Sequence, residues 1–167
     1  AAQSQAPGSA VTASSMPDST FLVDPDLLPA LNIKVQEVMA MLPTIEDART
    51  SGRPVDLKEY VVPGPAGAPD IRVLGFLPTK PAGPLPAMIY IHGGGYTSGN
   101  VEMTIRDCMD YAEHAGCATF SVDYRLAPAY PAPAACDDAV AAYQALLQRG
   151  YTPEQITLIG DSAGGNL

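Results

Sequence analysis

The feature that most constrains this chain is a run of five apolar residues, 87–91, with no polar position in it. A strand with one face in water alternates apolar and polar residues, whereas a continuous apolar run is typical of a strand that helices cover on both faces. Two more short, mainly apolar segments follow at 118–122 and 156–159. The three segments predict neighbouring strands of a parallel sheet at the centre of the fold.

Apolar residues at helical spacing fill the gaps between these strands. One set covers 105–112 and is followed by Gly116, and another covers 136–147 and is followed by Gly150. Glycine is typical just after a helix end because it adopts the left-handed conformation without strain. The order strand, helix, strand, helix, strand, with right-handed crossovers, predicts an α/β fold in which helices flank a mostly parallel sheet.

The segments upstream differ in character from this core. Residues 57–62 and 71–77 are strand-like, and the Pro- and Gly-rich sequence PGPAGAPD between them predicts an antiparallel pair with a long loop. Residues 1–23 contain too few apolar side chains to offset the entropy of ordering them, and predict a flexible arm. Apolar residues at helical spacing predict an amphipathic helix from Asp24 that ends before Pro43. The polar stretch 44–54 is predicted to be a connector.

Composition excludes several classes of function. The chain has 9 Lys and Arg against 18 Asp and Glu, a net charge of −9, so a nucleic-acid partner is not expected. No apolar run approaches the roughly 18 residues of a membrane span. The three cysteines, Cys108, Cys117 and Cys136, lack the spacing of a zinc or redox motif, and we expect free, mostly buried thiols and no metal. No signal segment is recognisable at the start of the sequence, so we expect a soluble protein, in the cytoplasm rather than exported, with the compartment left open and one disulfide possible if the protein is exported.

The last strand-like segment runs directly into Gly160-Asp161-Ser162-Ala163-Gly164, a G-x-S-x-G sequence in the strand-to-turn setting that this motif requires. A serine on such a sharp turn has strained backbone angles, and its neighbours two positions away must be small because strand and helix nearly touch there. The motif predicts that Ser162 is a nucleophile, held out at the carboxyl end of the sheet. A glycine-rich turn without chemistry is the alternative.

A second motif, His92-Gly93-Gly94-Gly95-Tyr96, follows the first apolar strand. Consecutive glycines let main-chain amides converge on one point, where they can stabilise the oxyanion of a tetrahedral intermediate. We expect the amides of Gly94 and Gly95 to donate, together with that of Ala163. A flexible loop or a phosphate cradle is the alternative, but a phosphate loop is expected to carry a lysine that this segment lacks.

These motifs resemble those of the hormone-sensitive-lipase-like esterases, a branch of the α/β hydrolases. The resemblance rests on HGGGY at 92–96, DYRLAPAYPAPAACDD at 123–138 and GDSAGGNL at 160–167, in the order of that family. It implies hydrolysis of carboxylic esters without a cofactor and an N-terminal helical cap, here residues 24–55. Residues 56–167 would then be the N-terminal part of the catalytic domain, up to the nucleophile. Ala129 departs from the family, which usually has Glu in the YRLAPE segment.

Other residues of the middle motif favour structural roles. Arg125 is expected to form a charge-assisted pair with Asp137 or Asp138, both in the first turn of a predicted helix. The two aromatic residues next to the motifs, Tyr96 and Tyr124, line the substrate cleft or serve as packing residues.

A serine nucleophile needs a general base, usually a histidine that a carboxylate orients. His114 is expected at the opposite edge of the sheet, roughly 17 Å from Ser162, and lies four residues after Asp110, a spacing typical of a surface ion pair. His92 shares the edge of Ser162 and could be oriented by Asp123, but it begins the loop that must aim the amides. In the family, acid and base follow the nucleophile.

We therefore expect the acid and the histidine beyond Leu167 or in a second chain, so that the hydrolase fold is incomplete here. The predicted function is a serine carboxylesterase that cleaves short- to medium-chain esters through an acyl-enzyme. The predicted partners are the small ester and the C-terminal remainder as a second polypeptide, with homo-oligomers left open. A catalytically silent hydrolase-fold receptor that binds a small ligand is the alternative function.

Overall fold

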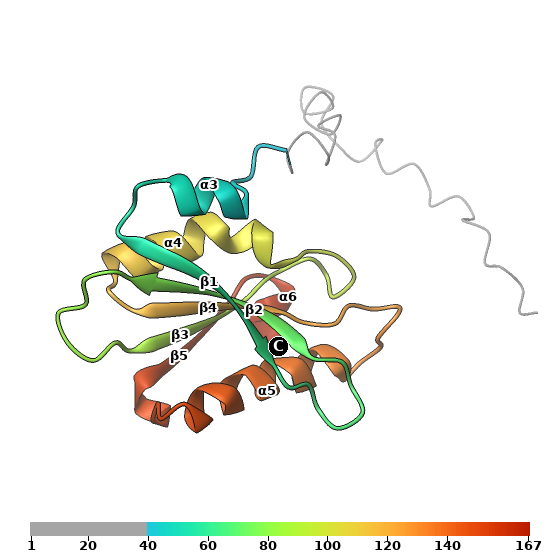
Figure 1. Cartoon of the computed structure of the whole chain (residues 1–167). Helices are drawn as coiled ribbons and strands as arrows, with labels where there is room; N and C mark the ends of the chain where they lie inside the picture. The colour runs from blue at the N-terminus through green and yellow to red at the C-terminus, as the bar shows by residue number, and fades with distance from the viewer. Residues whose placement is uncertain (1–39) are drawn as a thin grey trace, which may run out of the picture. The chain divides into compact units, whose positions relative to one another are not determined.

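The computed structural model describes residues 40–167, in which five strands form one sheet of order β1-β2-β4-β3-β5. The strands are β1 (Val55–Val62), β2 (Ile71–Pro78), β3 (Ala87–Ile91), β4 (Ala118–Asp123) and β5 (Ile156–Gly160). Strands β3, β4 and β5 are mutually parallel, whereas β2 is antiparallel to both β1 and β4. Strand β2 therefore runs against the other four strands (Figure 1).

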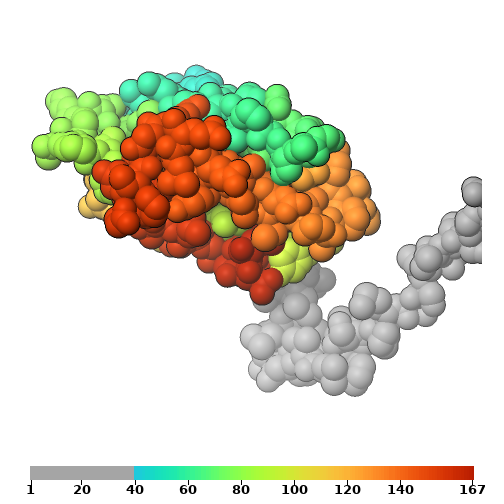
Figure 2. All heavy atoms as spheres, turned by 90° about the horizontal axis from the view of Figure 1, so that it is seen from below, coloured from blue at the N-terminus to red at the C-terminus, as the bar shows by residue number. Residues whose placement is uncertain are grey.

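Helices cover both faces of the sheet (Figure 1). The helical segments are α3 (Ile45–Thr50), η3 (Val101–Thr104), α4 (Ile105–His114), α5 (Ala134–Gln148), η4 (Pro153–Gln155) and α6 (Ala163–Asn166). Helices α3 and α4 share one buried cluster with the sheet, and α5 packs on the opposite face, where its orange atoms cover the sheet from below (Figure 2). Within residues 40–167, none of the helices combines the length and apolar character needed to cross a membrane.

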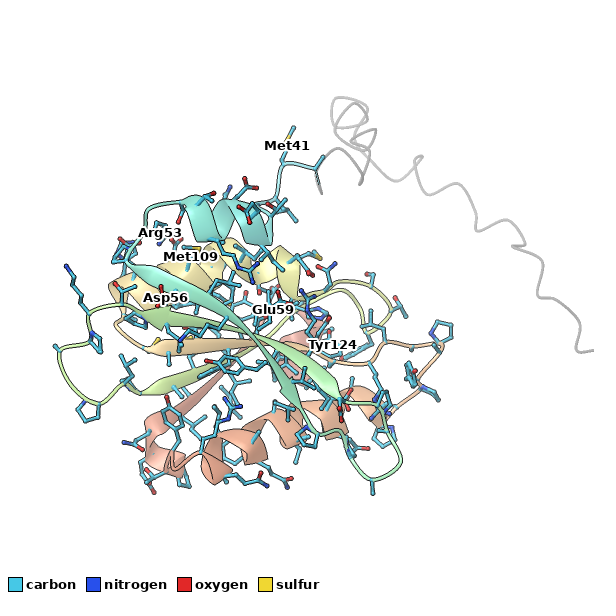
Figure 3. All side chains as sticks on the ribbon, in the orientation of Figure 1. Met41, Arg53, Asp56, Glu59, Met109 and Tyr124 are labelled. Atoms are coloured by element: carbon cyan, nitrogen blue, oxygen red, sulfur yellow. The ribbon has the colours of Figure 1, made fainter. Side chains whose placement is uncertain are left out.

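The pleat of the strands divides the core between the two faces. On β2, Val73 contributes to the cluster under α5, while Leu74 and Phe76 contribute to the cluster under α4 and are fully buried. Met109 of α4 packs into this second cluster (Figure 3). Both faces of the central strands are thus covered by side chains, as the continuous apolar run at 87–91 predicts.

The elements predicted for the α/β core are confirmed. Strand β3 has the predicted bounds, and β1 begins two residues before the expected Leu57. Gly116 and Gly150 follow α4 and α5 with φ of 63° and 96°. The three cysteines are free, with Cys108 and Cys117 buried and Cys136 exposed.

Two predictions for the N-terminal region are wrong where the structure describes it. The predicted connector 44–54 contains α3, which begins at a capping box: the Asp47 amide donates to Thr44 Oγ1 (3.1 Å), and the Thr44 amide donates to Asp47 Oδ2 (2.8 Å). Residues 40–42 form a turn, not the end of the predicted helix. The predicted arm 1–23 and the rest of that helix lie outside the described residues.

The predicted surface pair of Asp110 with His114 is also wrong, because Arg53 takes the carboxylate instead. Arg53 lies between α3 and β1 and reaches α4, where its guanidinium is 2.7 Å from Asp110 and 2.6 Å from Glu113 (Figure 3). One planar cation that meets two carboxylates holds the α3–β1 connection against α4.

Of the two partners predicted for Arg125, the structure selects Asp138. The Arg125 guanidinium donates to both carboxylate oxygens, with Nη2 to Oδ1 at 2.8 Å and Nε to Oδ2 at 2.9 Å, and the Arg125 amide donates to Oδ2 at 2.9 Å. The Asp138 side chain is fully buried, whereas Asp137 is exposed. The pair fastens the segment after β4 to the start of α5.

This pair predicts a large difference between two adjacent acids. Asp138→Asn should lower the free energy of unfolding by about 3 kcal/mol, because it removes the fully buried carboxylate that pairs with the partly buried Arg125 guanidinium. Asp137→Asn, the matched control, should change it by less than about 0.5 kcal/mol. Urea unfolding of the protein that contains this chain measures both, and equal effects of the two substitutions would refute the assignment.

Candidate active site

The G-x-S-x-G sequence forms a tight turn between β5 and α6. Ser162 has φ of 50° and ψ of −115°, and it is one of two non-glycine residues with positive φ in the described chain. Hydrogen bonds from the Gly164 amide to the Asp161 carbonyl (2.7 Å) and from the Gly165 amide to the Ser162 carbonyl (3.0 Å) hold this conformation. The Ser162 side chain is exposed, so the strained turn presents its hydroxyl to solvent.

The two glycines of the motif are required by close packing. A Cβ on Gly160 would overlap the main chain of Gly164, and a Cβ on Gly164 would overlap the Ile91 carbonyl and lie 2.7 Å from the His92 carbonyl oxygen. Helix α6 therefore begins directly against the carboxyl ends of β5 and β3. No side chain larger than hydrogen fits at either position without moving backbone.

The triple-glycine segment lies beside this turn. Strands β3 and β5 are paired with Ile91 opposite Gly160, and the Asp161 amide donates to the Ile91 carbonyl at 3.2 Å. A Cβ on Gly93 would lie 3.2 Å from Ser162 Cβ. Two motifs that begin 68 residues apart in the chain, at 92 and 160, are thus neighbours at the carboxyl edge of the sheet, as the sequence predicts.

The carbonyl and amide groups of the triple-glycine segment differ in their hydrogen bonds. The Gly94 carbonyl accepts from the Thr97 amide (3.2 Å), the Ser98 amide (3.0 Å) and the Ser98 hydroxyl (2.8 Å). Gly94 and Gly95 have φ of 119° and 62°. Their own amides, and that of Ala163, donate to no acceptor among residues 40–167. Two of these donors belong to the residues that directly follow Gly93, which packs on Ser162, and the third belongs to the residue after Ser162.

His92 lies beneath the loop in a buried position. Its ring stacks on Tyr124 with centroids 4.2 Å apart, and its Nδ1 is 2.6 Å from the Gly93 carbonyl oxygen. Because a carbonyl only accepts, Nδ1 carries the proton, which leaves Nε2 as a buried acceptor that has no partner in the described chain. Burial lowers the pKa of His92 below 6.5, more than its bond to Gly93 raises it, so the ring is neutral at pH 7.

Tyr124 packs in the core against His92. It is buried, and its hydroxyl donates to the His92 carbonyl at 2.8 Å. Tyr96, the other candidate, is partly exposed and lines a cavity of about 300 Å³ with residues of the segment after β4.

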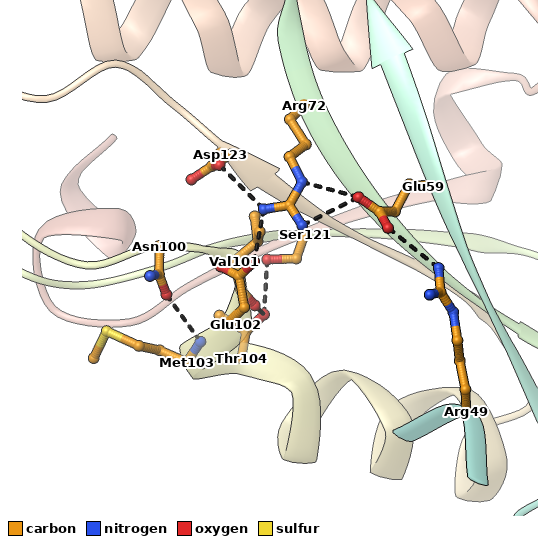
Figure 4. Close-up of polar contacts among 10 residues, drawn as sticks. All are labelled: Arg49, Glu59, Arg72, Asn100, Val101, Glu102, Met103, Thr104, Ser121 and Asp123. Carbon is orange, nitrogen blue, oxygen red and sulfur yellow. Dashed lines mark hydrogen bonds and ion pairs between the residues drawn. The ribbon is translucent and has the colours of Figure 1, made fainter. Parts of the chain in front are cut away.

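A group of charged residues, which sequence reasoning missed, holds η3, the next helical segment after the glycine loop (residues 92–96) (Figure 4). Arg72 of β2 contacts Glu102 of η3 at 2.7 Å, Glu59 of β1 at 3.1 Å and Asp123 of β4 at 3.7 Å. Glu59 also contacts Arg49 of α3 at 3.2 Å. These side chains are about one-third exposed or more, so each pair alone stabilises little, but together they connect five elements.

Uncharged contacts complete this anchor. The Thr104 and Ser121 hydroxyls form a buried hydrogen bond of 2.8 Å, and Asn100 Oδ1 accepts from the Met103 amide at 3.3 Å (Figure 4). Both contacts fix η3, the first element after the glycine loop. The alternation of side chains along β2 indicates which face of the sheet Arg72 points to. Its partners belong to β1, η3 and β4, and no local sequence pattern identifies them.

The structure does not bring His114 to the site. His114 ends α4 on the side of the sheet where β4 begins, while Ser162 follows the carboxyl end of β5. His92 is close to the site but donates Nδ1–H to a main-chain carbonyl rather than to Asp123. Neither histidine of the chain therefore makes a hydrogen bond to Ser162.

This arrangement places the chain in the class of α/β hydrolases, whose nucleophile follows a strand at the carboxyl edge of the sheet. Comparison with known proteins agrees, since residues 88–167 match the family model for the alpha/beta hydrolase fold. The chain is 39% identical over 118 residues to the carboxylic ester hydrolase LipN of Mycobacterium tuberculosis, covering 68% of this chain and 31% of LipN.

Two further relatives have related names. The ethyl acetate hydrolase of Pseudomonas putida is 38% identical over 85 residues, which are 48% of this chain and 27% of that enzyme. The structure of the hyperthermophilic esterase of the archaeon Pyrobaculum calidifontis superposes with a TM-score of 0.61 at 34% identity, over 78% of this chain and 39% of that one. The chain belongs to the hormone-sensitive-lipase-like branch of the alpha/beta hydrolase family, and it spans about a third of the length of LipN.

The packing of the turn predicts that Gly164→Ala disables the site. The added methyl group would push α6 away from the Ile91 carbonyl, so we expect a loss of about 3 kcal/mol in the free energy of unfolding and a displaced Ser162. Gly83→Ala is the matched control, because a Cβ there meets nothing within 4 Å and should change stability by less than about 0.5 kcal/mol. Thermal unfolding measures both variants, and similar stability of the two would contradict the packing argument.

Burial of neutral His92 predicts a pH dependence of stability. Because its folded-state pKa lies below the unfolded value near 6.5, the unfolded state binds a proton first, and stability falls as the pH drops below 6.5. His92→Asn should remove this part of the slope below pH 6.5. His114→Gln, which changes an exposed histidine, should retain it. The measurement is urea unfolding at several pH values, and an unchanged slope in His92→Asn would refute the prediction.

Proposed function

We propose that the protein containing this chain is a serine carboxylesterase. The observation that carries this proposal is the position of the strained, exposed Ser162 next to three main-chain amides that have no acceptor among the described residues. The relatives are named as ester hydrolases or esterases, which supports ester hydrolysis as the reaction.

In the proposed reaction, Ser162 Oγ attacks the ester carbonyl carbon and its proton passes to a general base. The carbonyl oxygen becomes an oxyanion, which the amides of Gly94, Gly95 and Ala163 stabilise. Each such donor contributes on the order of 10²- to 10³-fold in rate. The alcohol leaves with a proton from the base, and water hydrolyses the acyl-enzyme by the same steps in reverse.

The general base of this proposal is a histidine from outside the present chain, oriented by a carboxylate, located beyond Leu167 or on a second polypeptide. The positions of both histidines support this. His92 donates a hydrogen bond to the Gly93 carbonyl and stacks on Tyr124, and His114 is at the other edge of the sheet. Ser162 remains exposed, so a base can reach its hydroxyl from solvent.

The proposed substrates are small esters with short or medium acyl chains. The family resemblance and the name of the ethyl acetate hydrolase support a short acyl group. The lack of a fitting base within the chain favours one rival, a ligand-binding receptor that has lost turnover.

Ser162→Ala provides the test of the reaction. In the natural protein that contains this chain, it should reduce hydrolysis of a small activated ester such as p-nitrophenyl acetate by at least about 10⁴-fold and abolish labelling by a fluorophosphonate. Ser51→Ala, remote from the site at the end of α3, is the control and should leave both unchanged. Labelling that persists in Ser162→Ala would exclude this nucleophile, and a wild-type protein without turnover would favour the receptor.

The same labelled sample tests the source of the base. Denaturing mass analysis should reveal either a labelled polypeptide that continues past Leu167 or a second, unlabelled polypeptide in the active particle. An active, monomeric particle that contains this chain alone would refute the proposal of an external base.

A further inference from the structure

Tyr96 has a backbone conformation that its side chain disfavours. It is the second non-glycine residue with positive φ, at 65°, and it directly follows Gly94 and Gly95. Glycine would adopt this conformation without strain, as it does at the two preceding positions. A tyrosine here is therefore unfavourable for the main chain alone, which directs attention to what its side chain does.

The side chain of Tyr96 connects the glycine loop to the helix that follows Ser162. Its hydroxyl donates to Asn166 Oδ1, the last residue of α6, at 2.8 Å. Its main-chain carbonyl accepts from the Ala127 amide at 2.8 Å. Tyr96 thus joins three segments that meet around the candidate site: the glycine loop, the segment after β4, and α6.

The two ends of the glycine loop are held to the serine turn in different ways. At the near end, Gly93 packs on Asp161 and Ser162 through the main chain, and the Asp161 amide donates to Ile91. At the far end, the hydroxyl of Tyr96 makes the side-chain hydrogen bond to α6. Gly94 and Gly95 lie between these two points and have no side chains of their own to hold them in place. The positions of their amides relative to Ser162 therefore depend on both attachments.

We infer that Tyr96 and Asn166 are a pair of positioning residues that sets the distance between the oxyanion donors and Ser162. This inference rests on the proposed esterase function and names residues that support its oxyanion site. A misplaced donor weakens binding of the charged oxygen of the transition state more than binding of the neutral ester. Loss of the pair should therefore lower kcat and leave KM nearly unchanged.

The test compares variants of the natural protein in hydrolysis of p-nitrophenyl acetate. Tyr96→Phe and Asn166→Ala should each lower kcat about tenfold, with KM changed less than about twofold. The double variant should be no worse than either single variant, because both remove the same hydrogen bond. Thermal unfolding should be nearly unaffected, since the hydrogen bond is exposed.

Tyr130→Phe is the matched control. Tyr130 lines the same cavity and is 43% exposed, close to the 37% of Tyr96, but its hydroxyl makes no hydrogen bond within residues 40–167. We expect wild-type kcat for this variant. Wild-type kcat for Tyr96→Phe, or losses in the two single variants that multiply in the double variant, would overturn the inference.

A failure of the proposed esterase function would give a different result from a failure of the inference about Tyr96 and Asn166. If wild-type protein does not hydrolyse the ester, or Ser162→Ala retains turnover, both the esterase proposal and this inference are overturned. If Ser162 is required and Tyr96→Phe is unimpaired, only the role of Tyr96 and Asn166 is overturned.

Discussion

The candidate site depends on one close approach, that of Gly164 to the carbonyl group at the end of β3. Because Gly164 has no side chain, α6 begins in contact with Ile91, and the turn that precedes α6 comes next to Gly93. A helix set back by one methyl group would separate the serine from the glycine loop. The parallel pairing of β3 with β5 brings the two strand ends to the same edge, and the glycines allow the last few ångströms of approach.

Hydrogen bonds within the loop occupy two of its main-chain carbonyls. The carbonyl of Gly94 is occupied by Thr97 and Ser98, and that of Gly93 by the buried Nδ1–H of His92. With these carbonyls occupied, the neighbouring amides are the polar groups left for a ligand. A charged His92 in this place would need a second acceptor for Nε2–H, and the described chain offers none. The buried ring is therefore more stable in its neutral form.

Sequence reasoning succeeded where structure follows from local chemistry. Apolar runs, and glycines just after the helix ends, predicted the strands and helices of the core. The spacing of the glycines around Ser162 predicted its turn. It missed α3, although Thr44 and Asp47 have the spacing of a capping box, and it paired Asp110 with the wrong residue. Arg53 is 57 residues from Asp110, and which of several cations reaches a carboxylate depends on packing between elements, which local spacing does not reveal.

The contacts that hold Ser162 in its strained conformation lie within residues 87–167, and so do the three amides proposed to stabilise the oxyanion. The proposed base lies outside these residues. Stabilisation of a developing oxyanion requires dipoles that are already oriented before reaction, and the rigid junction of β3, β5 and α6 provides that orientation. Proton transfer requires one flexible side chain within reach of an exposed hydroxyl. Under the proposed function, this chain therefore supplies the oxyanion donors beside Ser162, and the proposed base approaches the exposed Ser162 hydroxyl from solvent.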